Sequence, residues 1–176
     1  PNNNIYGGTK AFVNHFSNIV KTALNVEERR KLAQDAFRNI LVHGIVRNKD
    51  RNSKMLSILE EQQKNNKSTL VMVEMLEHGE ELLRLCLERG LNAKYVQGNS
   101  LDRIDLVRGF AKGLFPILIS TTILDEGIDI SGINTLILAS GKKSKRQYLQ
   151  RIGRSLRKKK LGENVVNIFD FMDKGN

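Results

Sequence analysis

This sequence has a single cysteine and no long apolar run. The first feature excludes a disulfide-stabilised fold, and the second argues against a membrane-spanning chain. Cys86 is the only cysteine, so no disulfide can form within the chain, which fits a reducing, cytoplasmic compartment. It lies in the helical apolar pattern of Leu82, Leu83 and Leu87, which predicts a buried, inert thiol. No run could span a bilayer and no secretory segment is present. Because the chain begins at Pro1, we expect a soluble fragment of a longer protein.

Metal-binding and phosphate-loop motifs are also missing. His15, His43 and His78 are scattered, without a second ligand at a useful spacing, so we predict no metal site and no catalytic triad. Residues 7–10 lack the G-x-x-x-x-G-K-[ST] spacing and follow no strand, and residues 124–127 are not a magnesium-binding acidic box. The chain alone therefore lacks the groups that cradle the β- and γ-phosphates of ATP, and we expect it to be inactive alone.

Positive charge is concentrated in one stretch. The chain has 29 basic and 19 acidic residues, a net charge of +10, and ten of the basic residues lie between residues 141 and 160, where no acid occurs. Such a field attracts polyanions, among them nucleic acid and nucleotide phosphates. The alternative is a solvated helix face. The ten residues are Lys142, Lys143, Lys145, Arg146, Arg151, Arg154, Arg157, Lys158, Lys159 and Lys160.

The apolar pattern predicts an α/β fold preceded by a helical segment. Residues 1 to about 66 show helical spacing, with a break and a capping signal at Asn25 and a third helix from about Asp50. Short apolar runs without alternation then suit parallel strands buried on both faces. We expect strands at 69–73, 94–96, 117–120, 135–139 and 165–169, and helices near 77–89, 100–112 and 145–158. This order predicts a doubly wound parallel sheet of about five strands with helices on both faces.

Ligands of such sheets bind beyond the carboxyl ends of the strands, so the residues after each strand are the candidates for a site. Polar, glycine-containing segments follow the first four apolar runs at 74–79, 97–100, 121–129 and 139–146. The hydroxyls of Thr121 and Thr122 suit a phosphate, although they suit a helix cap equally well.

Arginines recur every three residues in the stretch QYLQRIGRSLRKK, residues 147–159. On a helix, Arg151, Arg154 and Arg157 would lie along one side, where their charges repel unless an anion or carboxylates face them. A triphosphate is the natural anion. For Arg151, the alternative is a salt bridge to Asp125 or Asp129.

The stretches ILISTTILDEGIDI and QYLQRIGRSLRKK resemble motifs V and VI of superfamily 2 helicases. The second matches Q-R-x-G-R-x-x-R at Gln150, Arg151, Gly153, Arg154 and Arg157. Residues 69–82 resemble motif IV and its helix, and the resemblance covers about residues 45–173. The glutamine of motif VI and the short basic segment GKKSK that precedes this motif look more like the UvsW, XPB and restriction-enzyme translocase branch than like the DEAD-box branch.

This resemblance implies a second RecA-like motor domain at residues 67–176, with residues 1–66 as a helical linker or accessory segment. Its implied substrate is ATP with Mg²⁺, bound mainly by a first motor domain outside this chain, and its implied partner is DNA, with RNA not excluded. A role in DNA repair or recombination would follow. Arg154 and Arg157 would be arginine fingers. The other implied contacts are Gly127, Asp129, Gln150 and Arg151 for nucleotide, and Gly98, Thr121, Lys142 and Lys143 for nucleic acid.

Two other functions fit parts of the pattern. A nucleic-acid-binding module could keep the fold without motor activity, and the nucleotide-sugar domain of a glycosyltransferase shares a doubly wound sheet. The glycosyltransferase interpretation gives no reason for three arginines at a spacing of three.

Overall fold

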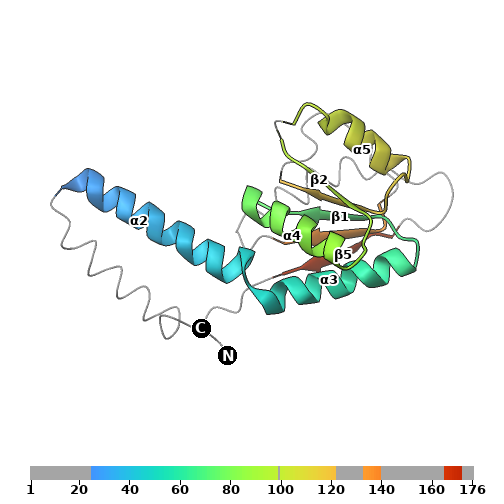
Figure 1. Ribbon diagram of the computed structural model, residues 1–176, viewed down its shortest axis with the longest axis horizontal. Helices are drawn as coiled ribbons and strands as arrows, with labels where there is room; N and C mark the ends of the chain where they lie inside the picture. Colours follow the sequence, from blue (N-terminus) through green and yellow to red (C-terminus); the bar gives the residue numbers. More distant parts are fainter. Residues whose placement is uncertain (1–24, 99, 122–132, 140–164, 172–176) are drawn as a thin grey trace. The chain divides into compact units, whose positions relative to one another are not determined.

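The computed structural model describes residues 25–98, 100–121, 133–139 and 165–171 (Figure 1). The chain divides into two compact units, residues 1–47 and residues 48–176. The helices predicted before residue 25 and at 145–158 lie outside the described residues.

The first unit contains helix α2, Val26–Leu41, and a π-helical turn η1, Val42–Val46. Asn25 caps α2, because its side-chain oxygen accepts a hydrogen bond from the backbone N–H of Glu28 at 2.8 Å. The carboxylate of Glu28 in turn accepts from the backbone N–H of Asn25 at 3.3 Å. This reciprocal pair is a capping box, so the predicted helix start is confirmed.

The second unit contains a five-stranded, fully parallel sheet in the order β2-β3-β1-β4-β5. The strands are β1, Thr69–Met72; β2, Ala93–Val96; β3, Ile117–Ser120; β4, Thr135–Leu138; and β5, Asn167–Asp170. All residues of β1, β3 and β4 are buried, whereas β5 is largely exposed. The predicted parallel α/β sheet is therefore confirmed.

Alternate residues of the strands face two apolar layers. Leu70, Leu118 and Leu136 pack with Val107 and Phe110 of α5, Arg103–Ala111. On the other face, Val71, Ile119 and Ile137 pack with helix α4, Leu76–Glu88, and helix α3, Lys49–Lys64. Figure 1 shows α5 on one side of the sheet and α3 with α4 on the other. The sheet is thus covered on both faces, as parallel sheets require.

Helix α3 belongs to the same unit as the sheet. Met55, Leu56 and Leu59 are almost completely buried in the layer that α4 shares. The hydroxyl of Thr135 in β4 donates to the side-chain oxygen of Gln62 at 2.8 Å, and both side chains are buried. The division predicted at residue 66 falls inside the second unit, whereas the structural division precedes α3.

The apolar face of α4 buries the cysteine. Leu82 and Cys86 are fully buried, and desolvation raises the pKa of the Cys86 thiol to about 12. The predicted buried thiol is confirmed, and it stays protonated at neutral pH. Leu87 was expected on the same face, but it is 57% exposed, so the buried stripe is narrower than predicted.

Gly79 lets the ring of Tyr95 pack directly against helix α4. A Cβ built on Gly79 would overlap the ring carbons of Tyr95, and Gly79 itself is buried. Gly109 in α5 differs, because a Cβ there would lie 3.4 Å from the nearest ring atom of Phe115, which is an ordinary contact distance.

These two glycines give a matched pair of substitutions. We expect Gly79→Ala to destabilise the chain by about 1 to 2 kcal/mol, because overpacking outweighs the roughly 1 kcal/mol gain in helix propensity. Gly109→Ala should be neutral or stabilising. Urea-induced unfolding measures both free energies. Equal effects of the two substitutions would contradict this explanation. So would strictly additive effects of Gly79→Ala and Tyr95→Ala in a double-mutant cycle, because the overlap disappears when the ring is removed.

Candidate functional site

The carboxyl ends of the five strands meet at one edge of the sheet, and the candidate site residues were predicted there. In the described structure, Gln97 and Gly98 follow β2, Thr121 follows β3, and Val73 leads from β1 towards α4. Ala139 and Phe171 follow β4 and β5. The parallel register therefore gathers five chain segments at a single edge.

Gly98 and Thr121 lie after neighbouring strands, because Val96 of β2 is in register with Ser120 of β3. Thr121 is only 8% exposed. The carbonyl of Gly98 accepts a hydrogen bond from the Arg103 guanidinium at 3.2 Å, which ties the turn after β2 to the start of α5. The two predicted nucleic-acid contacts are thus at the same edge of the sheet.

Tyr95 links strand β2 to the start of α4, and the sequence pattern did not single it out. Its hydroxyl donates to the carbonyl of Leu76 at 3.3 Å. Burial, and then the negative charges of Glu80 and Glu77, raise its pKa to about 12. Tyr95 therefore remains a protonated donor at neutral pH and holds the first turn of α4 against β2.

Arg51 reaches the same edge from helix α3. Its Nη2 atom donates to the carbonyl of Ala139 at 2.8 Å and to the carbonyl of Phe171 at 2.9 Å. The guanidinium carbon lies 5.6 Å from the centre of the Phe171 ring, a cation–π distance. Arg51 is only 6% exposed, so a buried cation joins the ends of β4 and β5.

His78 lies in the first turn of α4 and is 1% exposed. Burial, and then the nearby charge of Arg51, lower its pKa to about 4, against a smaller opposing effect of Glu81. Its Nε2 atom has no hydrogen-bond partner within the part of the chain that the structure describes. A neutral imidazole therefore stands near the Arg51 guanidinium, which avoids a repulsive pair of buried cations.

The remaining predicted site residues lie outside the described residues and stay predictions. Two segments contain them: residues 122–132, which start after Thr121, and residues 140–164, which start after Ala139. Both segments leave the sheet from its carboxyl edge. The residues are Gly127, Asp129, Lys142, Lys143, Gln150, Arg151, Arg154 and Arg157.

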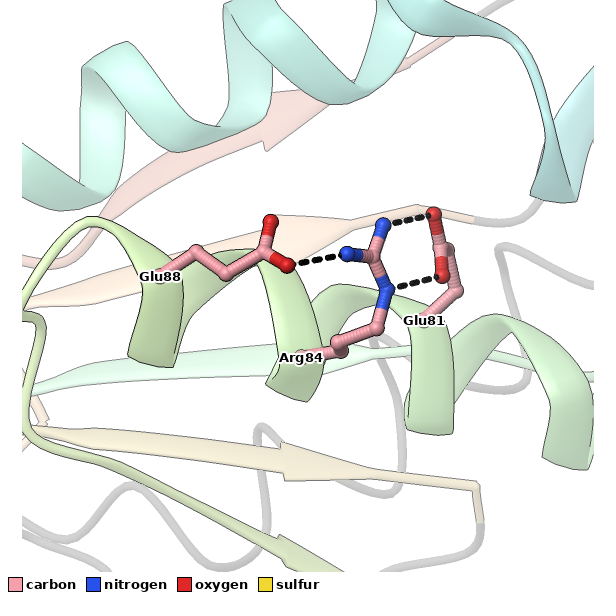
Figure 2. Close-up of polar contacts among 3 residues, drawn as sticks. All are labelled: Glu81, Arg84 and Glu88. Carbon is pink, nitrogen blue, oxygen red and sulfur yellow. Dashed lines mark hydrogen bonds and ion pairs between the residues drawn. The ribbon is translucent and has the colours of Figure 1, made fainter.

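A further charged cluster lies on α4 and is structural. Figure 2 shows that the Arg84 guanidinium donates two hydrogen bonds to the carboxylate of Glu81 and also contacts Glu88, one turn further along the helix. The two bonds to Glu81 are 2.8 and 2.9 Å long. The hydrogen bond to Glu81 is the main cause that raises the pKa of Arg84. The three side chains are partly or largely exposed and follow the helical spacing, so they form a surface ion-pair network rather than an anion site.

No helix within the described ranges is long and apolar enough to cross a membrane. In those same ranges, no group of three or more His, Cys, Asp or Glu side chains is arranged to hold a metal ion.

The family model for the helicase conserved C-terminal domain matches residues 50–159. That span runs from the first turn of α3 through strands β1 to β4 and includes the arginine series. The chain therefore belongs to this family, and its fold is the RecA-like C-terminal domain of superfamily 2 helicases.

Two curated relatives and one solved structure illustrate the similarity. The DNA 3'-5' translocase XPB2 of Sulfurisphaera tokodaii is 38% identical over 58 residues, which cover 33% of this chain and 13% of that protein. The UvrABC system protein B of Acaryochloris marina is 26% identical over 130 residues, 68% of this chain and 19% of that protein. The Sulfolobus solfataricus SWI2/SNF2 ATPase core in complex with dsDNA superimposes with a TM-score of 0.65 and 15% identity, covering 93% of this chain and 37% of that one. The chain thus spans a fifth or less of the length of these two relatives.

The buried imidazole makes a prediction about acid stability. The folded pKa of His78 is about 4, below the usual 6.5, so the unfolded chain binds the proton more readily. The free energy of unfolding should fall as the pH drops from 6.5 to about 4, by roughly 2 to 3 kcal/mol, and this contribution should level off below that pH.

Urea unfolding at several pH values tests the effect. Carboxylates also titrate at the lower end of this window, so the difference between the wild-type chain and His78→Gln isolates the imidazole. His43→Gln provides the control, because His43 is exposed and should keep the wild-type dependence. If His78→Gln retained the full wild-type loss of stability, the assignment of His78 as a buried neutral group would be wrong.

Proposed function

We propose that this chain is the second motor domain of an ATP-dependent DNA helicase or translocase. It would supply arginine fingers and nucleic-acid backbone contacts to an ATP site shared with a first RecA-like domain. The observation that carries the proposal is the family match over residues 50–159, which takes in the arginine series at Arg151, Arg154 and Arg157.

The chemistry of phosphoryl transfer gives these arginines a role. Negative charge on the γ-phosphate oxygens must be stabilised as the bond to the leaving oxygen breaks, and planar guanidinium groups provide several donors for that purpose. Arg154 and Arg157 would reach the γ-phosphate. Gln150 and Arg151 would couple the nucleotide to the facing domain, and Gly127 and Asp129 would lie near the ribose. Mg²⁺ would be held mainly by the first domain.

Nucleic acid would lie along the same edge of the sheet. Gly98 and Thr121 follow adjacent strands there. Lys142 and Lys143 follow β4 closely in the sequence and would add phosphate contacts. The relatives favour DNA, because XPB2 is named a DNA translocase and the SWI2/SNF2 core was solved with dsDNA. Closure of the two motor domains around ATP, and their release, would step the protein along the strand.

A role in DNA repair or recombination fits this branch of the superfamily. XPB2, which is named a DNA translocase, supports the DNA-directed part of this proposal by similarity. A nucleic-acid-binding module without motor activity is the competing function, and ATP turnover distinguishes the two.

In the full-length protein, we expect Arg154→Ala and Arg157→Ala each to lower kcat for ATP hydrolysis by at least about a hundredfold. The affinity for ATP should change by less than about tenfold, since a finger acts mainly on the transition state. Lysine at either position should not restore activity, because an ammonium lacks the planar, multiple-donor geometry. Steady-state turnover with saturating DNA measures these effects.

Lys158→Ala and Lys159→Ala are the controls. They lie beyond the Q-R-x-G-R-x-x-R pattern, so they should weaken DNA binding and leave basal turnover nearly intact. Thermal unfolding adds a second check. A stability loss of several kcal/mol for Arg154→Ala would show that the arginine holds the fold, and the finger assignment would then be abandoned.

A further inference from the structure

Arg51 joins the ends of two strands that lead directly out of the sheet. Helix α3 presents it, and the Asn48 side chain fixes its backbone by accepting from the Arg51 N–H at 3.0 Å. At the other end of the side chain, a single guanidinium nitrogen binds the carbonyls of both Ala139 and Phe171. Both the backbone and the head of this residue are therefore held in place.

The position of these two carbonyls explains why a cation is buried there. Leu138 of β4 is in register with Asp170 of β5, and the N–H of Phe171 donates to the carbonyl of Leu138 at 3.1 Å. The carbonyls of Ala139 and Phe171 come immediately after this last pairing, and Arg51 binds them both. Buried carbonyls need donors, and a charged donor forms the stronger bond.

The residues around Arg51 favour a buried guanidinium at this position. The ring of Phe171 lies against the guanidinium, and the neighbouring His78 is kept neutral by burial. A lysine at this position would keep the charge, but it would lose the fixed direction of the guanidinium donors.

We propose that Arg51 is a positioning residue for ATP hydrolysis. It would act by fixing the carbonyl of Ala139 beside that of Phe171 at the end of β4, the point in the sequence after which residues 140–164, with Arg154 and Arg157, follow. This inference rests on the proposed function. An arginine finger accelerates hydrolysis only when its guanidinium is correctly placed at the γ-phosphate, and a misplacement of about 1 Å can lower the rate about a hundredfold. A substitution of Arg51, although distant from the phosphate, should therefore lower kcat.

Arg51→Lys in the full-length protein tests the proposal, with Arg84→Lys as the matched control. Arg84 is an arginine of the same unit, but it is exposed, and it pairs with Glu81 and Glu88 of its own helix (Figure 2). We expect Arg51→Lys to lower kcat for DNA-stimulated ATP hydrolysis by about tenfold or more, with KM for ATP within about threefold of wild type. Arg84→Lys should match the wild type in both constants.

The assay is run at a temperature where circular dichroism shows every variant to be folded. A folded Arg51→Lys protein with wild-type kcat would overturn the proposal. So would a loss of turnover that only follows the unfolded fraction, because Arg51 would then merely hold the fold. Arg154→Ala, measured in parallel, separates the role of Arg51 from the assignment of the arginine fingers. If Arg154→Ala lowers kcat and Arg51→Lys does not, only the role of Arg51 is wrong. If neither lowers kcat, the finger assignment fails as well.

Discussion

Strand β1 is the element on which the second unit depends. Its four residues, Thr69 to Met72, are buried and are hydrogen-bonded on both sides, to β3 and to β4. Only an apolar strand can occupy such a position, because both of its faces are covered by helices. The chain crosses from β1 through α4 and β2 to β3 on one side, and β4 and β5 extend the other side. The strand ends that carry the candidate site are therefore brought to one edge by the pairing of a single central strand.

The edge of the sheet is also where the buried polar groups gather. The charged guanidinium of Arg51 is almost completely buried. The free-energy penalty of removing this charge from water is offset by its hydrogen bonds to two carbonyls and by the nearby aromatic ring. His78 is neutral beside it, and Tyr95 stays protonated beside Thr121. These interactions fix the positions of the carboxyl ends of the strands in addition to stabilising the fold.

The sequence predicted the strands and helices because their signals are local. Continuous apolar runs indicated the buried strands, and the Asn25 to Glu28 spacing indicated the capping box. Where boundaries moved, pairing was the cause. The apolar run from Val165 predicted a strand from that residue, but β5 begins at Asn167, because its partner β4 begins at Thr135 in the parallel register. Likewise, the predicted helix from residue 100 begins at Arg103, because the side chain and the N–H of Ser100 both bind the carbonyl of Gln97 in a turn.

The candidate site was only partly predictable for the same reason. Gly98 and Thr121 could be placed at this edge because each comes within two residues of the end of an apolar run, and their contacts with nucleic acid stay predictions. Arg51 contacts residues 88 and 120 positions away, and in the sequence it is one more charged residue in a polar helical turn. Gly79 and Tyr95 are similar, since no local pattern shows that a ring will pack against a helix glycine. His78 belonged to a set of scattered histidines, and only its burial distinguishes it.

The central claim is that this domain contributes half of an ATP site. Its most direct test is the ATP turnover of the purified 176-residue chain by itself, measured with and without DNA. The account predicts no turnover above background in either condition, because the chain has no phosphate loop and no acidic magnesium site in its sequence. Robust turnover that Arg154→Ala abolishes would contradict it, since the chain would then hold a complete site of its own.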